Sequence, residues 1–158
     1  MYNLMGDDMK TYLLHADTTR EISISDISIS DEDYNAGNPY NTTLSVKIKS
    51  GEFTGRGSFE LDIADFCTFA KELFGLYTNL SGKVLLRDIG YGSLMDFEAV
   101  DKIRHIQISG EIFGYASVHS VKFEFRVDQT ELRLFCKRLF DDFGALEKYK
   151  HKAKYNGS

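Results

Sequence analysis

The sequence is poor in the features that cross-link a chain or carry it through a membrane. Its 158 residues include no tryptophan, one proline and two cysteines. No apolar run approaches the ~20 residues that span a bilayer, and no basic N-terminal segment precedes an apolar stretch of the signal-peptide kind. We therefore expect a cytoplasmic protein. Cys67 and Cys136 each fall within an apolar helical pattern, which predicts buried, reduced thiols.

The composition is typical of a globular domain with an aromatic core. Apolar residues make up 42% of the chain and charged residues 27%, with 12 Phe and 9 Tyr. A chain of this length can bury one continuous core without cross-links. We predict a single domain over residues 1–158, with its core at about 20–144 and peripheral segments at 1–19 and 145–158.

Charge is distributed unevenly along the chain. The net charge is −5, yet residues 147–158 carry four lysines against one acidic residue, which leaves −8 for the remainder. A body of that charge repels phosphate backbones and attracts cationic partners. We expect a protein partner, and neither nucleic acid nor a membrane. The lysine-rich tail is predicted to fray in solvent.

Alternating apolar and polar residues predict about seven strands. The alternation at 20–30 changes phase near Asp26, which indicates a bulge, and Ser50-Gly51 joins two further strands into a hairpin. Gly55 and Gly57 expose bare backbone on one face, where we expect an aromatic ring from a helix to pack. The remaining strands are predicted at 84–87, 95–99, 106–112 and 121–127.

Two helices with apolar residues three and four apart are predicted at 62–80 and 129–143. Asp62 and Asp128 are suited to cap them, and Gly82 can close the first. Gly75, inside that helix, suggests that another element approaches closely there. The predicted fold class is α+β, a meandering antiparallel sheet of about seven strands with both amphipathic helices on one face.

No constellation of residues indicates catalysis. The four histidines lie far apart in sequence, and there is no Cys-x-x-Cys or His-Glu-x-x-His motif that would predict a metal site. Gly55-Arg56-Gly57 lacks the third glycine and the following helix of a dinucleotide loop. Neither cysteine has a neighbouring histidine as a base. We therefore predict no enzyme activity, no cofactor and no metal.

The segment from residue 31 to 41 is the one candidate for a binding site. It combines clustered acids with turn-forming residues and reads as an exposed acidic loop. Tyrosine beside negative charge suits an interface with a basic partner. An open alternative is a solubilising loop that binds nothing. The candidate partner-binding residues are Asp31, Glu32, Asp33, Tyr34 and Tyr40.

Several stretches resemble the WapI-type immunity proteins of bacterial contact-dependent toxin systems, over roughly residues 20–143. In the first half these are Phe53-Thr-Gly-Arg-Gly, Asp62-Ile-Ala-Asp-Phe and Leu73-Phe-Gly-Leu-Tyr-Thr-Asn-Leu-Ser-Gly-Lys-Val-Leu-Leu. In the second half they are Ile106-Gln-Ile-Ser-Gly-Glu-Ile and Val121-Lys-Phe-Glu-Phe-Arg-Val-Asp-Gln-Thr-Glu-Leu. Most of the matching positions are caps, glycines and core residues.

This resemblance implies a protein that neutralises a cognate toxin domain by stoichiometric binding. Such a role requires surface complementarity and no reaction chemistry. The acidic body would suit a cationic toxin. A small-ligand or adaptor domain is the alternative, which a pocket of ~300 Å³ or more beside an apolar patch would favour. A His-Asp pair in a cleft would instead favour an enzyme.

Overall fold

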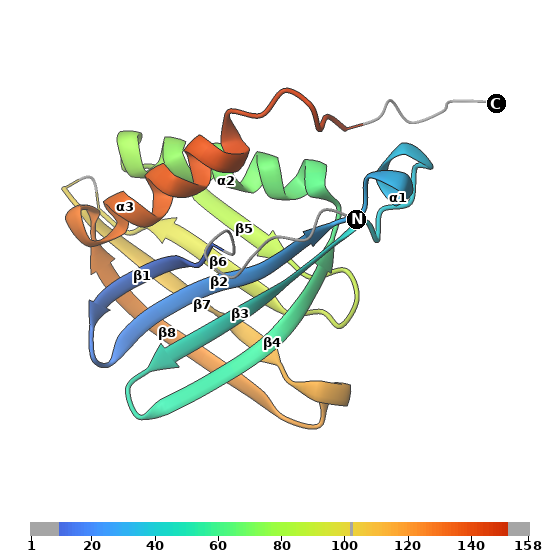
Figure 1. Cartoon of the computed structure of the whole chain (residues 1–158). Helices are drawn as coiled ribbons and strands as arrows, with labels where there is room; N and C mark the ends of the chain where they lie inside the picture. Colours follow the sequence, from blue (N-terminus) through green and yellow to red (C-terminus); the bar gives the residue numbers. More distant parts are fainter. Residues whose placement is uncertain (1–9, 102, 152–158) are drawn as a thin grey trace.

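The computed structural model describes residues 10–101 and 103–151, which form two antiparallel sheets and the helices that cover them (Figure 1). Within each sheet the strands follow chain order, so each is a simple meander. The first sheet contains β1 (Tyr12–Asp17), β2 (Arg20–Ile29), β3 (Thr42–Ser50) and β4 (Phe53–Leu61). The second contains β5 (Lys83–Arg87), β6 (Leu94–Ala99), β7 (His105–Phe113) and β8 (Ser120–Asp128). The predicted α+β class is confirmed, with eight strands divided between two sheets.

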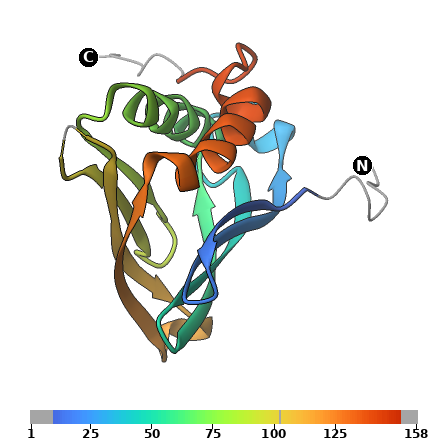
Figure 2. The ribbon, with the colours of Figure 1, turned by 90° about the vertical axis from the view of Figure 1, so that its left-hand side faces the viewer.

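The helices cover one end of the two sheets. The bounds are α1 (Asp31–Asn35), α2 (Ile63–Asn79) and α3 (Gln129–Leu139), and a π-helical turn at Phe140–Gly144 extends α3. Figure 2 shows the sheets diverging like a wedge toward α2 and α3 and converging at the opposite end. In the described part of the chain, none of the helices is both long and apolar enough to cross a bilayer.

Both predicted aspartate caps are present. The Asp62 carboxylate accepts a hydrogen bond of 3.0 Å from the Ala64 amide at the start of α2. Asp128 forms a reciprocal capping box at the start of α3, where its carboxylate accepts from the Glu131 amide at 2.8 Å. The Glu131 carboxylate accepts in turn from the Asp128 amide at 2.9 Å. These bonds satisfy amides that helix geometry leaves unpaired, and so they fix where each helix begins.

The core fills the space between the sheets and beneath the helices. Phe59, Phe66, Phe97 and Phe135 are all fully buried. The rings of Phe97 and Phe135 stack with centroids 6.4 Å apart, which joins a strand of the second sheet to α3. Both cysteines are buried and unbridged, as predicted. Burial, reinforced by the charge of Asp62, raises the pKa of Cys67 to about 11, so its thiol stays neutral.

Strand β1 brings the N-terminal segment into the core. Tyr12 and Leu14 are buried, so the core extends to the N-terminal side of residue 20. The Tyr12 hydroxyl donates a hydrogen bond of 2.6 Å to Asp142, and the Arg138 guanidinium lies 5.4 Å from the centre of the Tyr12 ring. Burial and the adjacent carboxylate raise the pKa of Tyr12 above its usual range. These contacts join β1 to the C-terminal helix.

The two sheets meet most closely at the glycines of β4. A Cβ atom at Gly55 would lie 2.8 Å from the Val121 Cβ. At Gly57 it would lie 2.7 Å from the Ile112 Cγ2 and would also collide with the Phe113 carbonyl oxygen. The expectation of a helical aromatic ring at this place was therefore wrong. Backbone and side chains of β7 and β8 require the bare glycines instead.

Helix α2 differs from prediction in its interior and at its end. No atom among the described residues, beyond the helix's own neighbouring backbone, lies within 4 Å of a Cβ built at Gly75. Another element does not approach there, so that expectation was wrong. Leu80, with φ of 51°, provides the left-handed C-cap that was assigned to Gly82. Its amide donates to the Leu76 carbonyl, and this bond ends the helix.

We expect Gly57→Ala to lower the free energy of unfolding by about 1–3 kcal/mol, because the added methyl group collides with the backbone of β7. Gly75→Ala is the matched control, since its methyl group enters open space on a helix. That substitution should raise the free energy of unfolding by up to about 1 kcal/mol. Urea titrations of both variants measure the difference, and equal stabilities would contradict this account of the sheet contact.

Candidate partner-binding surface

The first part of the acidic segment is a short helix and not the loop that was expected. Residues 31–35 form α1 because the Ser30 hydroxyl caps it, accepting a hydrogen bond of 3.1 Å from the Asp33 amide. The three acids fill the first turn, where negative charge is favourable. Asp31 and Glu32 are exposed, while Asp33 and Tyr34 are half-buried. The structure therefore brings four of the five predicted residues together on one turn.

The connection from α1 to β3 is fixed by a buried asparagine. Asn41 is 4% exposed, and its amide donates to the Asn38 carbonyl at 2.8 Å and to the Asp62 carboxylate at 3.1 Å. Its side-chain oxygen accepts from the Ile63 amide at 2.8 Å. These bonds fasten the segment to the start of α2. They hold Tyr40, the fifth predicted residue, with its ring half-exposed at 51%.

The C-terminal segment lies on α1, which contradicts the prediction that this tail frays, as far as residue 151. The Tyr149 hydroxyl donates to Asp31 at 2.6 Å, and the Lys148 ammonium lies 3.3 Å from the same carboxylate. The Tyr34 hydroxyl accepts from the Lys150 amide at 3.0 Å and lies 2.8 Å from its carbonyl oxygen. The lysines at 152 and 154 are outside the described residues.

Packing and electrostatics support these contacts with the tail. The Tyr34 and Tyr149 rings meet edge to face with their centroids 5.0 Å apart. The hydrogen bonds from Tyr149 and Lys148 lower the pKa of the Asp31 carboxyl below its usual range. Burial and the bond to Asp31 raise the pKa of the Tyr149 hydroxyl. The acidic turn thus already holds a short cationic and aromatic segment of its own chain.

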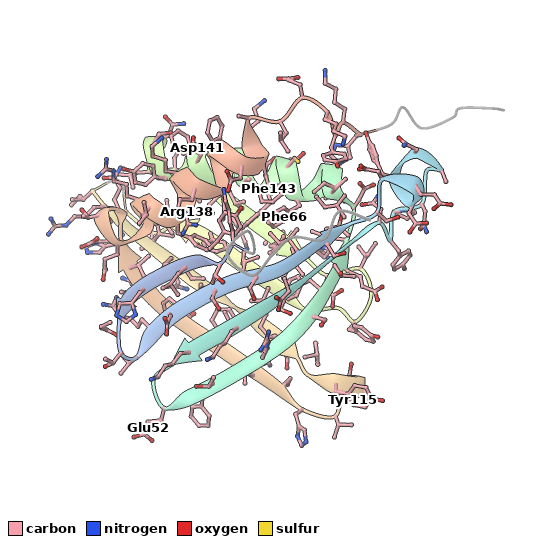
Figure 3. The ribbon with its side chains drawn as sticks, in the orientation of Figure 1. Glu52, Phe66, Tyr115, Arg138, Asp141 and Phe143 are labelled. Carbon is pink, nitrogen blue, oxygen red and sulfur yellow. The ribbon has the colours of Figure 1, made fainter. Side chains whose placement is uncertain are left out.

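Sequence reasoning missed an open groove at the side of β4. Its volume is about 450 Å³. Tyr91 from the β5–β6 connection and Tyr115 from the β7–β8 connection line it, and they are 55% and 96% exposed. Figure 3 shows Tyr115 and Glu52 projecting from the end of the molecule opposite α2 and α3. Tyr91, which stands between the turn-forming residues Gly90 and Gly92, was the available signal. The other lining residues are Ser45, Arg56, Gly57, Ser58, Phe113, Gly114 and Ala116.

A buried carboxylate positions Tyr91. Asp88 is 2% exposed and accepts hydrogen bonds from the backbone amides of Glu60, Gly90 and Tyr91 at 3.0, 2.9 and 3.1 Å. The Ile89 amide donates to the Glu60 carbonyl at 2.9 Å. The β5–β6 connection is therefore fastened to the end of β4. The Tyr40 hydroxyl lies 3.5 Å from the Ile89 carbonyl, so this connection links the α1 segment to the groove.

A His-Asp pair is present at the start of β7. His105 Nδ1 lies 2.7 Å from the Asp101 carboxylate, and both side chains are partly buried. Backbone amides of the same turn, together with His105, hold the pKa of Asp101 far below its usual range. His105 borders a shallow hollow whose lining includes no serine, threonine or cysteine. Within residues 10–101 and 103–151, no group of His, Cys, Asp and Glu is arranged to hold a metal.

We expect the hydrogen bond from Tyr149 to Asp31 to protect the C-terminal segment from proteolysis. Tyr149→Phe removes the donated hydrogen bond, so trypsin should cleave after Lys148 and Lys150 several times faster than in the unmodified protein. Tyr115→Phe, at the far end of the molecule, is the matched control and should leave the rate unchanged. Mass spectrometry of timed digests measures cleavage, and equal rates in all three proteins would contradict the docked tail.

The same contact has a predictable dependence on pH. Ionised Asp31 stabilises the docked tail above the unfolded-state pKa of ~3.9, and this contribution is lost as pH falls through the lower folded-state pKa. The protonated Tyr149 hydroxyl stabilises the docked tail below its unfolded-state pKa of ~10, and this stabilisation is lost as pH rises through the raised folded-state pKa. Ring resonances of Tyr149 should therefore stay unchanged between about pH 4 and 10.

Comparison with known proteins assigns the chain to a family. The profile of the immunity protein WapI-like family matches residues 16–147, which include all three helices, the acidic turn, the groove beside β4 and both sheets apart from most of β1. Comparison with curated proteins gave no match. The matched range covers most of the 158 residues, and the resemblance seen in the sequence is confirmed. The chain belongs to the WapI-like immunity protein family.

Proposed function

We propose that this protein neutralises a bacterial toxin domain by binding it stoichiometrically, without catalysing a reaction. The match to the WapI-like immunity family over residues 16–147 carries this proposal. The toxin would be met in the cytoplasm of the producing cell, where we place the protein. Inhibition by occupancy requires only a surface that is complementary to the toxin.

The connections that carry Tyr40 and Tyr91 are held in place, as binding to a complementary surface requires. Asn41 and Asp88, both buried, fix the two connections that carry Tyr40 and Tyr91. Tyrosines held in place lose little conformational entropy on binding and are enriched at interfaces. This supports a contact surface that is largely preformed before the partner arrives.

Charge supports a cationic partner. We propose that Asp31, Glu32, Asp33, Tyr34 and Tyr40 contact a basic patch on the toxin. The chain's own tail provides an internal example, because Lys148 and Tyr149 already bind Asp31. The net charge of −8 outside residues 147–158 would steer a basic domain toward this protein and accelerate association by ~10 to 10³ fold at low salt.

A small-ligand or adaptor role is the second candidate. The groove of about 450 Å³ beside β4 is large enough for a small molecule, and the exposed Tyr115 lies next to it. A thermal-shift screen of small metabolites separates the two functions. A ligand that raises the melting temperature of the unmodified protein but not of the Tyr91→Ala variant would favour the second candidate. The toxin-binding proposal predicts no such ligand.

We expect high salt, and reversal of acidic charge, to slow association with the toxin domain. The C-terminal domain of a large secreted protein would serve as this toxin domain if such a protein is encoded beside this gene. Glu32→Lys should lower the association rate about fivefold at low salt, because this exposed charge lies on the acidic turn. Stopped-flow measurements across a salt series detect the change.

Glu98→Lys is the matched control, since it makes a single charge reversal on β6 of the second sheet. Its association rate should remain within about twofold of the unmodified protein, as expected for a charge remote from the contact. If the rate is indifferent to ionic strength, or if Glu98→Lys slows association as much as the α1 variant, then the acidic turn is not the contact surface.

A further inference from the structure

Strand β4 has an edge that pairs with nothing over its first half, among the described residues. It lies at the border of the first sheet and pairs on one side with β3. At its far end, Glu60 directs its amide to Asp88 and its carbonyl to the Ile89 amide. Backbone groups alternate direction along an antiparallel strand. Thr54, Arg56 and Ser58 therefore point their amides and carbonyls away from β3, as Glu60 does.

The other three edge strands have their own contacts with neighbouring elements. Helix α3 packs against β1, and the Arg138 guanidinium donates to the Thr11 carbonyl at 3.1 Å. Helix α2 packs against β5. Strand β8 lies against β3 and β4, and its Arg126 carbonyl accepts from the Arg20 guanidinium. An open groove of about 450 Å³ lies beside the unpaired positions of β4.

The free part of β4 lacks most of the usual protection of an edge, since Arg56 is the one charged residue among residues 54–58. Proteins block such edges with prolines, lysines or bulges, because unpaired strands otherwise recruit other chains. Residues 54–58 contain no proline and no lysine. The register of β4 against β3 is continuous from Phe53 to Leu61, so no bulge turns the edge away. Thr54, Arg56 and Ser58 are all exposed.

We propose that an extended segment of the toxin pairs with β4 at Thr54–Ser58 and lies in the groove as an additional strand. Outward backbone donors and acceptors recur at every second residue, roughly 6.6 Å apart, and an extended polypeptide matches that spacing. Side chains of the added segment would lie beside Tyr91 and Tyr115. This inference rests on the proposed function and identifies how the partner is held.

Hydrogen exchange on the complex tests the pairing without any substitution. The probe is the same toxin domain, added in excess to the unmodified protein. Amides of Thr54, Arg56 and Ser58 should exchange freely in the unbound protein and slow by at least about tenfold in the complex. The Phe59 amide, which the alternation directs to β3, should be slow in both states and serves as the internal reference.

A proline substitution supplies the second arm. Ser58→Pro removes an outward donor while leaving the hydrogen bonds to β3 intact, so affinity for the toxin domain should fall at least about tenfold. Ser58→Ala keeps the donor and should bind within about threefold of the unmodified protein. Lys122→Pro makes the same change on the edge of β8 and should also leave affinity unchanged. Calorimetry measures all four proteins, and if Ser58→Pro does not fold, the exchange experiment decides.

The outcomes separate this inference from the proposed function. If the toxin domain binds but the three amides exchange as in the free protein, or if Ser58→Pro binds as Ser58→Ala does, strand addition is wrong and toxin binding stands. If the toxin domain does not bind the unmodified protein, the proposed function fails and strand addition fails with it.

Discussion

The contact between the two sheets at Gly55 and Gly57 determines the shape of the molecule. Because β4 has no side chains of its own at Gly55 and Gly57, the side chains of Val121 and Ile112 and the backbone of β7 come close to it, and the sheets are close at one end. Their twist then separates them toward the other end, as Figure 2 shows. The resulting space is filled by large aromatic residues and covered by α2 and α3. A branched residue at Gly55 would collide with the Val121 side chain, and one at Gly57 would collide with the backbone of β7.

The same geometry leaves the groove beside β4 accessible. With both long helices at the wide end, the narrow end and the side of β4 are open, and the groove lies there. Buried polar residues hold the connections around it, since Asn41 fastens the segment after α1 and Asp88 fastens the β5–β6 connection. The core therefore presents an acidic turn at the end that carries the helices, and exposed tyrosines beside an unpaired strand edge toward the opposite end (Figure 1, Figure 3). Each of these features suits protein binding more than chemistry.

Local patterns in the sequence predicted local structure well. Aspartate caps, alternating strands and the bulge at Asp26 depend on neighbouring residues alone, and all are present. The division into two sheets and the strand contact at Gly57 were not predicted, because both depend on pairing between distant segments. For α1, the signal was available: Ser30 precedes Asp33 by three residues, as in a helix cap.

The candidate site was only partly predictable for the same reason. The five acidic and aromatic residues were identified from composition, but the tail bound to Asp31 lies more than a hundred positions away, and no sequence period reports such a contact. Likewise, the groove forms where β4 meets two connections from the other sheet. Its residues have no common pattern in the chain, so only the folded arrangement reveals them.

The most direct measurement titrates this protein against a fixed amount of the active toxin domain. If neutralisation is by occupancy alone, residual toxin activity should fall linearly and reach its minimum at a molar ratio of one to one. The activity should return when the complex is separated under denaturing conditions and the toxin is refolded. Loss of activity at far smaller ratios, or loss that refolding does not restore, would show catalytic inactivation and contradict the account.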